Sequence, residues 1–267
     1  MSYLTRIQKR LPKEAWDSMR RLANLAGIFL VLAILIAAME RKEARVVNRV
    51  VVEINPLEED RYLIDSSDVV RIIVRTFGYG LENLPLARVE TERLERVLEE
   101  DPFVSEAEVF VDAEVNVHIA IEQREPILRV MDSSGKQYYL DAAGNQLPLS
   151  SHYTPRILVA TGNIPPYVTD FMEKEAYVLK DLFLLAQLIL DDKFLKPMTE
   201  QIHVGNNREF TLIPKLGRQK ILLGRAQHLE EKLDYLKLYY EKALPISGWK
   251  KYRALDLRYK GQIIGVE

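Results

Sequence analysis

The run from Leu22 to Met39 constrains this chain most, because about eighteen consecutive residues lack a charged side chain. As an α-helix the run is roughly 27 Å long, enough to cross the hydrocarbon core of a bilayer. Its apolar side chains together favour insertion by roughly 3–5 kcal/mol. A buried core helix of this length normally has a polar stripe, and a cleaved signal peptide has a short leader and small residues before its cleavage site. Neither feature is present, so residues 22–39 are predicted to be an uncleaved transmembrane helix.

Basic residues before this run predict its orientation. Residues 1–21 contain six Lys or Arg and only two acidic residues. Cytoplasmic flanks of membrane spans carry an excess of Lys and Arg. We therefore expect residues 1–21 to form a cytoplasmic tail and everything after about residue 40 to lie outside the cytoplasm.

Composition argues against several function classes. The 267 residues have a formal net charge of −2 and show no basic face of the size that nucleic-acid binding requires. The absence of cysteine excludes disulfides, thiol catalysis and Cys-ligated zinc. The histidines lack a partner at the spacing of a metal-binding helix and are interpreted as surface residues: His118, His152, His203 and His228. We expect no catalytic residues, metal, cofactor or small-molecule substrate.

Two S-x-x-K matches, Ser133–Lys136 and Ser247–Lys250, resemble the nucleophile motif of penicillin-binding enzymes. The accompanying S-D-N and K-T-G elements are missing, and both matches fall in expected turns or loops. A membrane-anchored cell-wall enzyme therefore remains the less favoured alternative.

The residues that follow the span predict the order strand, helix, helix, strand, strand. A β-branched alternating stretch covers 45–54, and helix-capping residues at 65–68 precede apolar residues at helical spacing. A second amphipathic helix is expected over 86–100. Alternation over 104–111 and again over 115–121 predicts a hairpin. This order resembles the POTRA domain, a small polypeptide-docking module.

Three further motifs carry a resemblance to the bacterial division family FtsQ/DivIB. Residues 122–126 read E-Q-R-E-P, residues 139–148 read Y-L-D-A-A-G-N-Q-L-P, and residues 254–259 read A-L-D-L-R-Y. The resemblance covers essentially the whole chain. It implies an α+β architecture: the tail and span, a POTRA-like β-α-α-β-β domain over 45–124, and a mixed β-sheet domain with two helices over 125–267.

The elements expected in the second domain follow from turn residues and periodicity. They are a hairpin at 127–131 and 137–140, strands at 156–160, 202–204, 210–213 and 220–223, a buried helix at 171–190, an amphipathic helix at 227–243 and a closing strand within 252–266.

The closing strand is the predicted partner-binding site, because a final strand often leaves one edge free to accept another chain. The candidate residues are Leu257, Arg258, Tyr259, Gly261, Ile263 and Ile264. On the sequence alone, Ile263 and Ile264 suit the domain's own core and a partner surface equally. Arg258 suits either a partner carboxylate or Asp256.

The family resemblance implies partners of the FtsB and FtsL type and a place in the inner membrane at the division site. On that basis the chain is predicted to be a non-catalytic scaffold. A POTRA-bearing secretion or transport component is the main alternative within the binding class.

Overall fold

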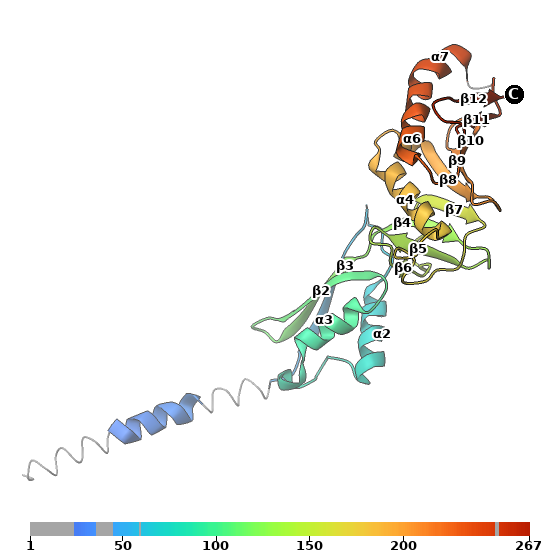
Figure 1. The fold of residues 1–267 in the computed structure, drawn as a ribbon. Helices are drawn as coiled ribbons and strands as arrows, with labels where there is room; N and C mark the ends of the chain where they lie inside the picture. Colours follow the sequence, from blue (N-terminus) through green and yellow to red (C-terminus); the bar gives the residue numbers. More distant parts are fainter. Residues whose placement is uncertain (1–23, 36–44, 59, 249–250) are drawn as a thin grey trace, which may run out of the picture.

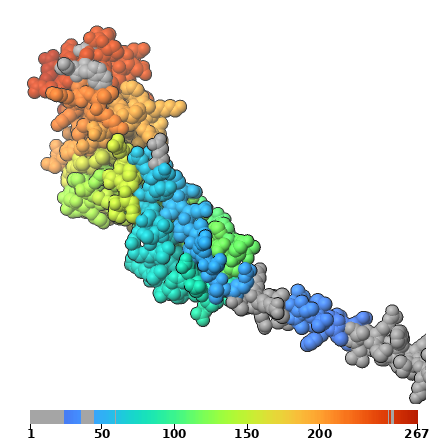
Figure 2. Space-filling model, turned by 180° about the vertical axis from the view of Figure 1, so that it is seen from behind, coloured from blue at the N-terminus to red at the C-terminus, as the bar shows by residue number. Residues whose placement is uncertain are grey.

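A computed structural model describes residues 24–35, 45–58, 60–248 and 251–267. It shows two domains arranged end to end (Figures 1 and 2). The predicted tail lies outside the described residues, as do both ends of the predicted span; the part between, 24–35, is helical. The large apolar side chains of this helix are 51–74% exposed. Within the described residues, no helix combines the length and apolarity needed to cross a bilayer.

The first domain has the order of elements expected from the sequence. Its elements are β1 (Arg49–Asn55), α2 (Ser66–Phe77), the short 3₁₀ helix η1 (Leu86–Arg88), α3 (Thr91–Glu99), β2 (Val104–Val111) and β3 (Asn116–Gln123). The sheet order is β1-β3-β2, with β1 parallel and β2 antiparallel to β3. The predicted hairpin is therefore confirmed as β2–β3. Both helices pack on one face of the sheet through Val69, Ile73, Leu94 and Leu98.

Helix α2 begins where the predicted cap lies. The Asp65 carboxylate accepts the Asp68 N–H at 2.9 Å, and the Asp68 carboxylate accepts the Asp65 N–H at 3.1 Å. This reciprocal arrangement satisfies two backbone donors that the first helical turn leaves unpaired. Gly78 ends the helix at φ +78°, in the left-handed region that glycine adopts without a steric cost.

The second domain is built on one mixed sheet of nine strands, in the order β12-β11-β10-β9-β8-β7-β4-β5-β6. The strands are β4 (Pro126–Met131), β5 (Gln137–Asp141), β6 (Gln146–Leu147), β7 (Leu158–Gly162), β8 (Thr199–Val204), β9 (Phe210–Pro214), β10 (Lys220–Gly224), β11 (Ala254–Asp256) and β12 (Ile264–Val266). The helices are α4 (Val178–Asp191), α5 (Leu195–Met198), α6 (Leu229–Leu238), the π-helical turn η2 (Tyr239–Ala243) and α7 (Leu244–Ser247).

Helix α4 is a core helix, as its broad apolar face predicts. It buries Leu179, Leu182, Phe183, Leu185, Ala186 and Ile189 against the sheet. It begins at Val178, later than the expected residue 171, because the residues before it form turns and Ala176 has φ +49°. The first S-x-x-K match lies in the β4–β5 turn, and Lys250 of the second lies outside the described residues.

The expected closing strand over 252–266 is instead two short strands. Strand β11 pairs with β10 on one side and with β12 on the other, so it is interior to the sheet. The chain leaves β11 after Asp256 and returns as β12, with Gly261 at φ +74° in the connection. The expectation that Tyr259 continues the strand is therefore wrong. Strand β12 is the strand at this end of the sheet.

Candidate protein-docking site and the interdomain contact

Leu257, the first predicted partner-binding residue, is part of the core. Its side chain is 1% exposed and packs with Leu255, and its N–H donates to the Leu222 carbonyl at 2.9 Å. The backbone thus stays attached to β10 for one residue beyond β11. Leu257 positions the following loop and is not accessible to a partner, which corrects its assignment as a contact residue.

Arg258 binds Asp256 of its own chain, the second of the two roles that the sequence left open. Its Nε donates to Asp256 Oδ1 at 2.9 Å and its Nη2 to Oδ2 at 2.6 Å. The guanidinium lowers the pKa of the largely buried Asp256 below its usual value of 3.8. The aliphatic part of Arg258 covers Gly224, where a Cβ atom would lie 2.8 Å from Arg258 Cγ. Arg258 therefore fixes the turn that follows β11.

Tyr259 and Gly261 lie at a cleft between this turn and α6. Tyr259 is 53% exposed. The cleft is lined by Gln227, His228, Glu231, Lys232 and Tyr235 on the helix side and by residues 257–262 on the turn side. Lys232 donates its ammonium to the carbonyls of Leu223 and Arg225 at 2.7 and 3.2 Å, and desolvation lowers its pKa. The cleft is lined by polar groups and ends, along the chain, two residues before β12.

The sequence left open whether Ile263 and Ile264 pack on the domain core or lie at the surface, and the structure gives a different answer for each. Ile263 is half-buried and packs against the domain core. Ile264 and Val266, both in β12, are 41% and 42% exposed. Within the described residues, β12 pairs only with β11, so its other edge has no partner strand. A short open edge with exposed apolar side chains can accept an added strand.

Two residues that support β12 were missed by the sequence reasoning. Tyr252 lies against Gly265, where a Cβ atom would come within 2.5 Å of the Tyr252 ring. Gly265 is therefore the residue that lets β12 approach this ring. Its place opposite Leu255 in the β11–β12 pairing follows from tertiary structure, and the sequence contains no local signal for it.

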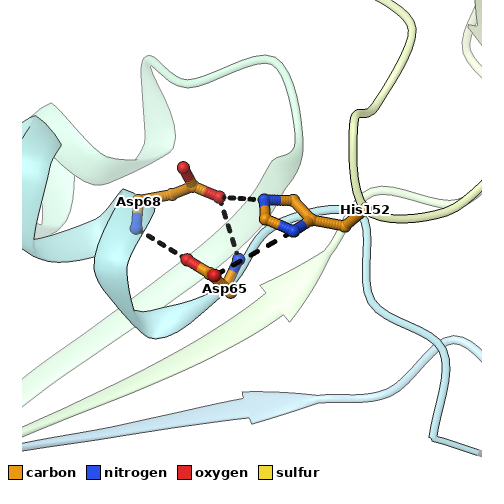
Figure 3. Close-up of side chains that lie close together, drawn as sticks. All are labelled: Asp65, Asp68 and His152. Atoms are coloured by element: carbon orange, nitrogen blue, oxygen red, sulfur yellow. Dashed lines mark hydrogen bonds and ion pairs between the residues drawn. The ribbon is translucent and has the colours of Figure 1, made fainter.

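A cluster of Asp65, Asp68 and His152 joins the two domains (Figure 3). His152 precedes β7 in the second domain, and its Nε2 lies 2.7 Å from Asp68 Oδ2 at the start of α2. Two carboxylates and an imidazole are a possible donor set for a divalent cation. Here both carboxylates already accept backbone N–H bonds, and the Arg71 guanidinium contacts Asp68. The cluster is therefore a hydrogen-bonded interdomain contact, and His152 takes part in it although it lies at the surface.

Arg124 is another interdomain link, and it explains two of the sequence motifs. Its guanidinium donates to the buried Asp141 at 3.1 Å and to the carbonyls of Val104 and Pro102 at 2.8 and 3.2 Å. Asp141 also accepts the N–H groups of Ala143 and Asn145 at 2.9 and 2.8 Å. The arginine of E-Q-R-E-P and the buried aspartate of Y-L-D thus form one partly buried connection between the domains.

Comparison with known proteins gives two matches. A family model described as FtsQ/DivIB, C-terminal related, matches residues 125–266. A model described as a POTRA-like domain matches residues 45–122. No curated protein matches the chain.

Proposed function

Because the chain belongs to the FtsQ/DivIB-related family, we propose that it is a non-catalytic scaffold at the division site that recruits its partners at strand β12. The single observation that carries this proposal is the unpaired edge of β12, with Ile264 and Val266 exposed along it. Its partners are membrane-tethered division proteins of the FtsB and FtsL type. One of them supplies an extended segment that becomes the next strand of the sheet.

The neighbouring residues have different tasks in this docking. Backbone hydrogen bonds along the free edge supply affinity, and alternate side chains of the added strand supply selectivity. Leu257 and Arg258 hold the turn in place from inside the domain. Tyr259 and Gly261 border the cleft beside α6, which receives side chains of the partner that extend beyond the strand.

We further propose that residues 22–39 anchor the chain in the cytoplasmic membrane, with residues 1–21 inside and residues 45–267 outside. The exposed apolar side chains of helix 24–35 support this assignment. Tethering both partners to one membrane raises the effective concentration of one for the other, so a short added strand suffices for recruitment. A protease added to spheroplasts should digest the two domains and leave an N-terminal tag intact; loss of that tag would contradict the orientation.

The docking proposal is tested by charging the open edge. We replace Ile264 and Val266 by lysine in the full chain, because charges on an edge strand oppose further pairing. Leu216→Lys is the matched control: Leu216 lies in the turn between β9 and β10, outside β12, and is 66% exposed. Affinity is measured by titrating the detergent-solubilised chain with the extracytoplasmic segment of an FtsB-type protein.

The double variant should bind this segment roughly tenfold or more weakly, while the control binds like the wild type. Circular dichroism verifies that both variants are folded. Equal affinity of the folded double variant and the control would refute docking at β12.

A further inference from the structure

Strand β1 has the longest edge of regular register among the four ends of the two sheets. Strand β1 follows β3 over seven residues with no register shift. At the other end of that sheet, β2 has an irregular register near Val104 and carries Glu106 and Glu108. In the large sheet, β12 and β6 have only three and two residues. Irregular register and charge are how proteins protect their edges, and the three valines of β1 have neither.

The backbone groups of β1 are oriented for such pairing. Just before the strand, the Val47 N–H donates to the Leu84 carbonyl, and the Val47 carbonyl accepts the Asn83 N–H. Both bonds lie on the side away from β3. In a strand, residues that share a side-chain face direct their backbone groups to the same side. Val47 faces the helices, and so do Val50 and Val52. The N–H and C=O groups of Val50 and Val52 therefore point to the open edge.

Helix α2 leaves an apolar surface beside this edge. Val70 and Val74 are 44% and 42% exposed. Together with Ile73 and Val50 they line a hollow between α2, β1 and the loop after α2. If another strand paired with β1, its apolar side chains would cover this hollow.

The charge pattern of β1 is complementary to itself. Residues 49–53 read Arg-Val-Val-Val-Glu, with the basic and the acidic residue at equal distances on either side of Val51. If two copies of β1 run antiparallel with Val51 opposite Val51, Arg49 of each copy lies opposite Glu53 of the other. In the same register Val50 lies opposite Val52, so residues with outward backbone groups meet. Both charged side chains are exposed, and neither makes an ion pair among the described residues.

We propose that β1 pairs antiparallel with β1 of a second copy of this chain, about a two-fold axis at Val51. The two three-stranded sheets become one, and the two α2 helices lie next to each other on the same face. A surface that meets itself across a two-fold axis must be self-complementary, and residues 49–53 satisfy that condition. The pattern of opposite charges at matching positions identifies the occupant of this edge as a second copy.

The pairing has a defined relation to the membrane proposed above. The two-fold axis runs along the sheet normal, and the two Arg45 residues lie at opposite ends of the paired strands, about 40 Å apart. The membrane spans of both copies can enter the same bilayer if the joined sheet lies parallel to the membrane surface. Strand β12 belongs to the other domain and stays free in each copy, so this pairing does not rest on the proposed docking site.

Cysteine crosslinking tests the proposal directly, because the natural chain contains no cysteine. With Val51 at the axis, the two Val51 residues form a non-hydrogen-bonded pair, whose Cα atoms lie about 4.5 Å apart, within disulfide range. Full-length Val51→Cys is oxidised in membranes and run on a non-reducing gel. Glu108→Cys, an exposed position on the β2 edge, is the matched control. We expect a covalent homodimer for Val51→Cys at several times the yield of the control.

Charge exchange tests the register. In the Val51→Cys background, Arg49→Glu or Glu53→Arg alone places like charges at both ends of the pairing and should weaken it roughly three- to thirtyfold. The double exchange restores the opposite charges and should restore the crosslink. Equal yields for Val51→Cys and Glu108→Cys, an adduct with another protein in place of the homodimer, or no recovery in the double exchange would each overturn the proposal. Both substituted residues are exposed, so the variants remain folded, which circular dichroism verifies.

Discussion

Replacing Arg124 by alanine removes the guanidinium that connects the two domains and leaves the buried Asp141 carboxylate without its counter-charge. Three hydrogen bonds of this side chain are lost, to Asp141, Val104 and Pro102. A hydrogen bond to a charged group contributes about 1.5–3 kcal/mol, and breaking a buried ion pair costs about 3–5 kcal/mol. The Arg124 side chain is 25% exposed, so water replaces part of the loss. We expect the free energy of unfolding to fall by about 3 kcal/mol.

The measurement is urea unfolding of the full chain in detergent, followed by circular dichroism. Arg124→Lys keeps the charge but cannot reach all three acceptors, so it should lose about half as much. The double variant with Asp141→Asn isolates the pair itself. Its coupling energy should be about 1–3 kcal/mol, because the two residues are in direct contact. Strictly additive effects, or a loss below about 1 kcal/mol for Arg124→Ala, would refute the argument that this pair holds the domains together.

Three smaller predictions follow from contacts described above. Gly265→Ala forces a Cβ atom against the Tyr252 ring and should cost about 1–3 kcal/mol, seen as faster hydrogen exchange in β12. Hydrogen bonds, first from the Asn116 N–H, lower the pKa of Asp112 from 3.8 to about 2. Their stabilisation is therefore present above the usual carboxyl pKa and is lost as the pH falls through about 2, so the melting temperatures of wild type and Asp112→Asn should converge there. His152→Gln should lower stability by about 0.5–1.5 kcal/mol and increase protease cleavage near residue 152, whereas unchanged cleavage would argue against the interdomain contact.

The elements of the first domain could be predicted because their signals are local. The cap residue Asp65 lies three positions before its hydrogen-bond partner Asp68, and the β2–β3 hairpin comes from two adjacent alternating stretches. The parallel pairing of β1 with β3 had no such signal, because it joins residues 67 positions apart, as Val51 and His118 illustrate. The His152–Asp68 contact was missed for the same reason: its two residues are separated by 84 positions.

The closing segment shows where alternation misleads. Leu255 and Leu257 are both buried, as the period of two predicts, but this pattern does not show where pairing stops. Strand β11 ends at Asp256 because Arg258 turns back to bind that carboxylate, and Gly261 then reverses the chain. Of the six candidate residues only Ile264 lies in the edge strand β12; the other five lie between β11 and β12.

The nine-stranded sheet has a further consequence for the direction of approach. Neighbouring strands are rotated by roughly 20–25° in one sense, so over the eight steps from β6 to β12 the strand direction turns through roughly half a revolution. The end that joins the first domain and the end that carries the open edge therefore present their strands along very different headings. The accumulated twist of the sheet therefore sets the orientation in which another polypeptide must lie to pair with β12. Inserting or deleting one middle strand would change this orientation without altering any contact residue.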